Sequence, residues 1–123
     1  MSRLLVVDDD ADILEGLAIV LQDRHDVSTA SNGLEALKLL QTQTFDAMVL
    51  DLMMPLMDGE TLIEKMRHSN IVVPVVLASA SSDVTLLAAR LGVDHITKPY
   101  DIALLEEKVA RLIAASGPSK DTA

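Results

Sequence analysis

The chain alternates short continuous apolar runs with segments whose apolar residues recur at helical spacing. Short apolar runs rich in β-branched residues are typical of strands. Five such runs occur, at Leu4–Val7, Val27–Thr29, Ala47–Leu50, Val72–Ala78 and Val93–Thr97. The first, third and fourth runs are continuous rather than alternating, which is typical of parallel strands covered on both faces.

A segment with apolar residues three and four positions apart follows each run and predicts a helix. These segments cover Ile13–Leu21, Leu34–Leu40, Leu62–Met66, Leu86–Leu91 and Ile102–Ile113. Asn32 and Glu35 form a capping-box pattern at the start of the second predicted helix. Ser81 or Ser82 is the expected N-cap of the fourth helix, and Gly92 is expected to end it.

The order of these elements predicts a βα unit repeated five times. This order is typical of the α/β class, as a single doubly wound (βα)5 domain with helices on both faces of a five-stranded parallel sheet. We expect the flavodoxin-like strand order 2-1-3-4-5. The domain is expected to span residues 1–115, and the small, polar residues 116–123 are expected to be a flexible tail or the start of a linker.

Composition narrows the classes of partner. The net charge is −9, with 19 acidic against 10 basic residues, which argues against direct contact of this domain with nucleic acid. There is no cysteine, which fits a reducing compartment. Because no apolar run reaches the length of about 20 residues that spans a bilayer, we expect a cytoplasmic protein without membrane contact.

Two of the predicted strands lead directly into acidic residues. Asp8 and Asp9 follow the first strand, and Asp51 ends the third. If these strands are neighbours, the three carboxylates meet in the crevice beyond the carboxyl ends of the strands. Like charges this close repel, and Mg²⁺, which takes oxygen ligands, would offset the repulsion. Asp10 and Asp12 are expected instead to cap the next helix and complement its dipole; taken alone, Asp8 and Asp9 fit either role.

The fourth and fifth strands bring further polar groups to the same edge. Ser79 ends the fourth strand and Lys98 follows the fifth. A nucleophilic oxygen, a metal site, a hydroxyl and an ammonium are the groups that phosphoryl transfer requires. The joint placement of these side chains predicts one site that handles a phosphoryl group.

Several motifs together carry a resemblance to a known family. They are "VVDD" at 6–9, "VLDLMMPLMDG" at 49–59, a strand ending in Ser79 before Ala80, and "KP" at 98–99. Over about residues 3–115 the chain resembles the response-regulator receiver domain of two-component signalling, the CheY-like family. The resemblance implies a phosphorylation-activated switch rather than an enzyme, which assists its own phosphorylation and dephosphorylation.

The resemblance also implies a role for each site residue. Asp51 would be the phosphoacceptor, taking the phosphoryl group from a sensor histidine kinase or a phosphotransfer protein. Mg²⁺, with Mn²⁺ as the alternative ion, would be held by Asp8, Asp9, Asp51 and the backbone carbonyl of Met53.

The remaining implied roles concern the phosphoryl group and the output. Ser79 would hydrogen-bond the phosphoryl group and Lys98 would form an ion pair with it, before a cis bond to Pro99. In the family an aromatic residue three positions before the lysine moves together with the hydroxyl residue. His95 stands there in this chain, so Ser79 and His95 are the expected switch pair, although a surface histidine without that role fits equally well. A homodimer through the fourth helix, fifth strand and fifth helix is a further expectation.

Two alternative functions stay open at this point. The chain could be an interaction module with a receiver fold that needs no phosphate, for which His95 leaves room. It could also be a metal-dependent phosphatase with an aspartate nucleophile. Such enzymes generally carry a second acid two residues after the nucleophile, and Met53 stands there.

Overall fold

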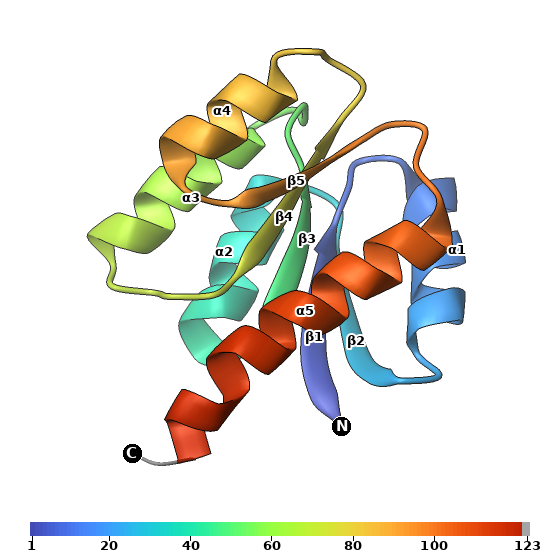
Figure 1. The fold of residues 1–123 in the computed structure, drawn as a ribbon. Helices are drawn as coiled ribbons and strands as arrows, with labels where there is room; N and C mark the ends of the chain where they lie inside the picture. The colour runs from blue at the N-terminus through green and yellow to red at the C-terminus, as the bar shows by residue number, and fades with distance from the viewer. Residues whose placement is uncertain (122–123) are drawn as a thin grey trace.

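Five strands alternate with five helices along the chain in the computed structural model (Figure 1). The backbone is described for residues 1–121 and the side chains for residues 1–115. The strands are β1 (Ser2–Val7), β2 (His25–Ala30), β3 (Ala47–Asp51), β4 (Val75–Ser79) and β5 (Asp94–Thr97). The helices are α1 (Ala11–Leu21), α2 (Gly33–Thr42), α3 (Gly59–His68), α4 (Val84–Leu91) and α5 (Ile102–Asp121).

The strands form one parallel sheet in the order β2-β1-β3-β4-β5, as predicted. The register sets the position of the strand ends. Val7 of β1 lies beside Leu50 of β3, and Ser79 of β4 lies beside Thr97 of β5. The residues that follow β1 and β5 therefore reach the same edge of the sheet as the last residues of β3 and β4.

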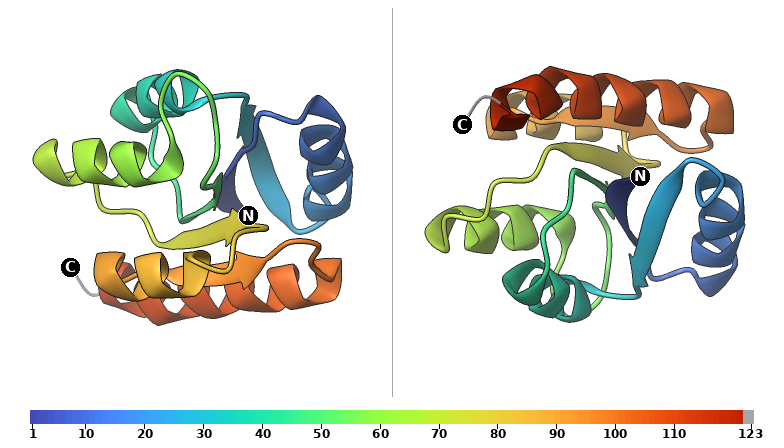
Figure 2. Two further views of the ribbon diagram at one scale, coloured as in Figure 1. Left: turned by 90° about the horizontal axis from the view of Figure 1, so that it is seen from above. Right: turned by 90° about the horizontal axis from the view of Figure 1, so that it is seen from below.

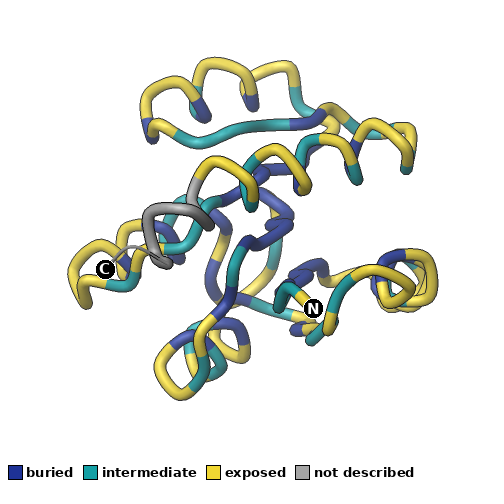
Figure 3. The backbone as a smooth tube through the Cα atoms, turned by 60° about the horizontal axis from the view of Figure 1, so that its bottom comes forward, coloured by how far each residue is buried: buried dark blue, intermediate teal, exposed yellow. Residues whose placement is uncertain are grey.

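The apolar side chains pack in two layers, one on each face of the sheet, and the helices lie on both sides of the strands (Figure 2). Residues of α2, α3 and α4 cover the face that includes Leu5, Val7, Met48, Leu50 and Leu77. Residues of α1 and α5 cover the opposite face. Buried residues follow the strands and the inward sides of the helices (Figure 3). Burial on both faces explains why the strand sequences are continuously apolar.

The predicted N-cap of α2 is confirmed, and the capping box is formed in part. The Asn32 side chain accepts a hydrogen bond from the backbone N–H of Glu35 at 2.9 Å. The Glu35 carboxylate does not bond to the N-cap Asn32. It accepts instead from the backbone N–H of Ser31, the residue before the N-cap, at 2.8 Å. Gly92 ends α4 with a positive φ of 72°, a conformation that favours glycine.

The fourth strand begins later than the sequence predicts. The apolar run suggested Val72–Ala78, whereas β4 is Val75–Ser79. Pro74 has no N–H to donate to a neighbouring strand, although its carbonyl accepts from the backbone N–H of Met48 at 2.9 Å. The residues before Pro74 lie in the loop, and Val72 is 91% exposed.

The prediction of a serine N-cap for α4 is wrong. The N-cap is Asp83, whose side chain makes no capping hydrogen bond. Ser81 lies two residues before the N-cap: its hydroxyl accepts from the backbone N–H of Asp83 at 3.2 Å, and its carbonyl accepts from the N–H of Val84 at 3.3 Å. A run of three polar residues offers three alternative caps, and the loop geometry selects among them.

The last helix starts as predicted, with the Asp101 carboxylate accepting from the N–H of Ala103 at 2.8 Å. Its helical backbone is described as far as Asp121. The predicted tail at 116–123 lies outside the residues whose side chains are described, so that assignment stays a prediction. No helix within the described part of the chain is long and apolar enough to cross a membrane.

Candidate functional site

Three carboxylates converge at the carboxyl edge of the sheet. Asp8 and Asp9 follow β1, and Asp51 is the last residue of β3. One oxygen from each carboxylate lies within 4.8 Å of the other two. The sheet order that the sequence predicted brings these residues together, because β1 and β3 are neighbours.

The carboxyl edge also contains every buried polar residue of the described part of the chain. These residues are Asp8, Asp51 and Ser79, with exposed fractions of 3%, 5% and 2%. Burying a charge is costly unless it is paired or bound to a metal. Because this cost is confined to one edge, we infer that these side chains serve chemistry rather than stability.

Lys98 supplies the positive charge of the site. Its Nζ lies 3.0 Å from Oδ2 of Asp8 and 3.5 Å from Oδ1 of Asp51. The backbone N–H of Lys98 donates to the carbonyl of Ser79 at 2.8 Å, which continues the pairing of β5 with β4. Burial alone would lower the pKa of Lys98, but its hydrogen bond to Asp8 and the charges of Asp51 and Asp8 raise it. The ammonium is therefore held in its charged form.

The Asp51 carboxyl has a raised pKa. Burial is the largest cause and the nearby charge of Asp8 the next, and together they raise the pKa of Asp51 to about 6. Lys98 and the backbone N–H of Met53, which donates to Oδ1 of Asp51 at 3.4 Å, oppose this rise. One ammonium thus offsets the repulsion between the carboxylates only in part, which leaves negative charge for a further cation to neutralise.

The donor atoms of this cluster fit a hard divalent cation. Carboxylate oxygens suit Mg²⁺, which usually takes one or two carboxylates in proteins and keeps several waters. Asp9 is exposed and Asp8 and Asp51 are buried, so the cluster is open to solvent on one side. A site that is rich in oxygen and open on one side leaves room for the waters and for a phosphoryl oxygen.

The neighbouring acids have the capping role that the sequence predicted. The Asp10 carboxylate accepts from the backbone N–H groups of Asp12 and Ile13 at the start of α1. Asp12 lies in the first turn of that helix, where a negative charge favours the helix dipole. The backbone N–H of Asp10 in turn donates to Oδ1 of Asp8 at 2.9 Å. The cap therefore also helps to orient Asp8.

Ser79 is the last residue of β4 and is buried at the carboxyl edge of the sheet. Its Oγ accepts a hydrogen bond from the backbone N–H of Ser81 at 3.0 Å. A hydroxyl that accepts one bond can still donate its own hydrogen to another group. The loop that leads into α4 is therefore tied to the Ser79 hydroxyl.

Two close approaches fix the loop between β3 and α3. A Cβ on Gly59 would lie 2.9 Å from the backbone oxygen of Asp51, and a Cβ on Gly33 would lie 2.5 Å from the backbone oxygen of Met57. The N–H of Gly59 donates to the carbonyl of Leu52 at 2.9 Å. The glycine of the sequence motif, Gly59, is thus required because it packs against the backbone of Asp51, the last residue of β3.

An open pocket of about 600 Å³ surrounds Asp51, Ser79 and Lys98. Its wall includes carboxylates that the sequence analysis did not assign to the site: Asp58, Glu60 and Asp83. Asp58 is the N-cap of α3, with its carboxylate accepting from the N–H of Thr61 at 2.8 Å. Glu60 pairs with Arg90, thirty residues away, at 2.7 Å. No local motif joins residues so distant in sequence, so only the packing of α3 beside α4 could show this pair.

Comparison with known proteins agrees with this geometry. Residues 4–110 match the response regulator receiver domain family. This chain belongs to that family. It is a receiver domain of the two-component type, and receiver domains are signalling domains whose proteins are phosphorylated by histidine kinases. The resemblance identified in the sequence is confirmed.

The relatives of this receiver domain include longer regulators. It is 39% identical over 119 residues to the transcriptional regulatory protein PrrA of Mycobacterium leprae, covering 94% of this chain and 51% of that protein. It is 38% identical to a CpxR homolog of Haemophilus influenzae, covering 98% and 55% of the two chains. The receiver domain thus spans about half the length of these curated relatives.

A solved structure supports the fold as well. The receiver domain of the Francisella response regulator 1452 matches with a TM-score of 0.88 and 33% identity, over 94% of this chain and 99% of that one.

Two further expectations concern β5 and the residues after it. The Lys98–Pro99 bond of this chain is cis, as the resemblance implied. His95 lies on β5, with its Nε2 3.3 Å from Oγ1 of Thr85 on α4.

Proposed function

We propose that Asp51 accepts a phosphoryl group from a phosphohistidine of a sensor histidine kinase or a phosphotransfer protein, in a reaction that depends on Mg²⁺. The observation that carries this proposal is the arrangement around Asp51. Its buried carboxylate has Lys98 at 3.5 Å and both Asp8 and Asp9 within 4.8 Å. This set supplies a nucleophile, a cation and ligands for a metal in one open pocket.

The transfer step follows from these groups. An oxygen of Asp51 attacks phosphorus, the P–N bond to the donor imidazole breaks, and the nitrogen keeps the electron pair. Asp51 must be ionised to attack, and at pH 7.5 a carboxyl group with a pKa of about 6 is mostly ionised. Lys98 would then pair with the phosphoryl oxygens, and the Ser79 hydroxyl would donate to another.

Asp8, Asp9, Asp51 and the backbone carbonyl of Met53 are the ligands that we assign to Mg²⁺, with Mn²⁺ as a substitute. Bound there, the ion would neutralise charge on the phosphoryl oxygens. The same residues would let the domain assist its own phosphorylation by small donors and its own dephosphorylation.

The output would begin at Ser79. A hydroxyl that turns toward the phosphoryl group changes its contact with the N–H of Ser81, now at 3.0 Å. The loop that carries Ser81 leads directly into α4, and α4 contacts His95 through Thr85. Ser79 and His95 are therefore the switch pair that we propose, and their movement would alter the face formed by α4, β5 and α5.

The partners follow from this assignment. We infer that the face of α4, β5 and α5 carries the signal, through a homodimer or through contact with an output domain. The net charge of −9 argues against contact of this domain with nucleic acid, even though the relatives named above are transcriptional regulators. A cytoplasmic location fits a partner kinase that uses ATP and a chain without cysteine.

Mass spectrometry of the intact protein tests the proposal. Incubation with Mg²⁺ and a small acyl phosphate should add one phosphoryl group to the wild type. Asp51→Asn should add none, and EDTA should prevent the addition. An interaction module that needs no phosphate would give no adduct, and an equal adduct on Asp51→Asn would place the acceptor elsewhere. A phosphatase would instead consume the donor over many turnovers.

A further inference from the structure

One ion pair joins the wall of the Asp51 pocket to the neighbouring helix. Glu60, in the first turn of α3, lines the pocket together with Asp51, Ser79 and Lys98. Its Oε2 lies 2.7 Å from Nη2 of Arg90, in the last turn of α4. The pair thus places a positive charge from α4 against a carboxylate of the pocket wall.

A second contact holds Arg90 in this position. The Arg67 guanidinium on α3 donates to the backbone carbonyl of Leu91, the residue after Arg90 and the last of α4. Two side chains of α3, about two turns apart, therefore fasten the same end of α4. Because this end of α4 is fastened, Arg90 has a fixed approach to Glu60 even though its own side chain is 66% exposed.

The charge of the pocket wall is unfavourable for an anion. Asp58, Glu60 and Asp83 contribute carboxylates to it, and the one cation among the pocket-lining residues, Lys98, contacts Asp8 and Asp51. Small phosphoryl donors such as acyl phosphates are dianions near neutral pH, so each uncompensated carboxylate at the wall disfavours their entry. Arg90 compensates the carboxylate of Glu60.

We propose that Arg90 is a specificity-determining residue that sets how readily the site takes a phosphoryl group from small dianionic donors. With Arg90 present, the Glu60–Arg90 pair is neutral in sum, and without it the wall gains one net negative charge. A phosphohistidine on a protein brings its own surrounding charges, so it depends less on this pair. This inference rests on Asp51 as the phosphoacceptor.

The chemical step with a small donor is balanced without a proton. An oxygen of Asp51 bonds to phosphorus, and the P–O bond to the acyl group of the donor breaks. The acyl carboxylate leaves with the electron pair, and the phosphoryl group keeps its two negative charges on Asp51. Arg90 contacts none of these atoms in the structure, so it acts only through the electrostatic potential that the donor meets as it enters the pocket.

The experiment compares initial rates of adduct formation by intact mass, with Mg²⁺ and acetyl phosphate at low ionic strength. Arg90→Gln should slow the reaction about two- to fivefold, and Glu60→Gln should speed it by a similar factor. The double variant is neutral again and should return close to the wild-type rate. All three differences should shrink in 0.5 M salt, because salt screens exposed charges.

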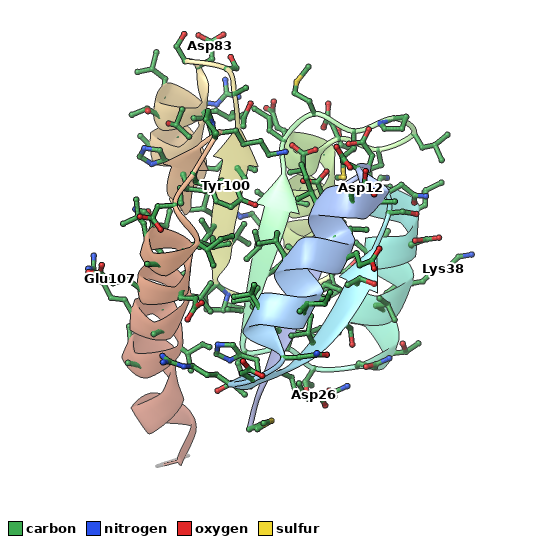
Figure 4. The ribbon with its side chains drawn as sticks, turned by 90° about the vertical axis from the view of Figure 1, so that its right-hand side faces the viewer. Asp12, Asp26, Lys38, Asp83, Tyr100 and Glu107 are labelled. Carbon is green, nitrogen blue, oxygen red and sulfur yellow. The ribbon has the colours of Figure 1, made fainter. Side chains whose placement is uncertain are left out.

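A matched ion pair serves as the control. Glu107 and Arg111 on α5 also lie 2.7 Å apart and are exposed, and Glu107 points away from the sheet (Figure 4). Glu107→Gln and Arg111→Gln should leave the rate unchanged. A double variant as slow as Arg90→Gln, or a loss that salt does not reduce, would overturn the proposal in favour of a structural role. If the wild type forms no adduct at all, the assignment of Asp51 fails instead.

Discussion

The carboxyl and amino edges of the β-sheet differ in how deeply their charged side chains are buried. At the carboxyl edge Asp8 and Asp51 are buried within reach of each other, with Lys98 as their shared partner. At the amino edge Arg3 and Asp26 form a pair at 3.9 Å with side-chain exposures of 38% and 66%. In Figure 4, Asp12 lies near the carboxyl edge of the sheet and Asp26 lies at its amino edge.

The difference has an energetic meaning. Ion pairs exposed to solvent contribute little to the free energy of unfolding. Substitutions at the amino edge should therefore change stability little. Buried like charges destabilise the fold unless a cation balances them, and the pKa of Asp51 is raised first by burial and second by the charge of Asp8. We therefore expect changes at the carboxyl edge to alter stability strongly and changes at the amino edge to alter it little.

The largest effect is expected from Lys98→Ala. Removing the ammonium leaves Asp8 and Asp51 buried without their shared partner, which should lower the free energy of unfolding by about 3 kcal/mol at pH 7.5 without metal. Urea unfolding followed by circular dichroism measures this change. Lys38→Ala is the matched control, because Lys38 is an exposed lysine on α2 that points into solvent (Figure 4), and its loss should cost less than about 0.5 kcal/mol. Equal losses for both variants would contradict the account.

Asp51→Asn should act in the opposite direction and stabilise the metal-free protein. The pKa of Asp51 is raised from 3.8 to about 6 on folding, so the folded state binds more protons than the unfolded state between these values. Stability therefore falls as pH rises from about 4 to about 6, and the penalty is complete above pH 6. The substitution should add about 2 kcal/mol at pH 7.5 and nothing near pH 3.5.

The control for this prediction is Asp23→Asn, a change at an exposed aspartate in the turn between α1 and β2. It should leave the pH dependence of unfolding as in the wild type. An Asp51→Asn protein that is less stable than the wild type at pH 7.5 would show that Asp51 contributes favourably to the fold, contrary to the interpretation of the buried cluster.

Mg²⁺ should stabilise the folded domain by an intermediate amount. At a free concentration ten times the Kd, binding to the folded state alone adds about 1.4 kcal/mol. Asp9→Asn should abolish most of this increment. Asp10→Asn should keep it, because Asp10 caps α1 and asparagine is also a good N-cap. Loss of the Mg²⁺ effect in Asp10→Asn would move the metal site to a different set of carboxylates.

The smallest effect is expected at the amino edge. Val72 is 91% exposed in the loop before β4, so Val72→Ser should change the free energy of unfolding by less than about 0.5 kcal/mol and leave adduct formation at the wild-type rate. A large loss of stability there would show that the two edges do not differ as described.

Much of the fold followed from the sequence, because apolar patterning reflects burial directly. Continuous apolar runs such as Leu4–Val7 and Ala47–Leu50 are buried on both faces, and each was located within three residues of its observed ends. Patterning shows burial but not where hydrogen bonding begins, so the start of β4 was placed three residues early, in front of Pro74.

The core of the site was also predictable, since strand order determines which strand ends meet. Once β1 and β3 are neighbours, Asp8 and Asp51 must lie close together. The wall of the pocket was not predictable, because Glu60 and Arg90 come from helices whose mutual approach no local pattern encodes. The Nδ1 of His25, the first residue of β2, is buried without a hydrogen-bond partner among the described residues, and burial is the main cause that lowers the pKa of His25.

A crystal structure with Mg²⁺ and beryllofluoride, a mimic of the phosphoryl group, tests the central claim most directly. The account predicts beryllium bonded to an oxygen of Asp51, with Lys98 and Ser79 contacting fluorine and Mg²⁺ held by Asp8, Asp9 and Asp51. Beryllofluoride bound to a different carboxylate, or Mg²⁺ bound away from the carboxyl edge of the sheet, would contradict it.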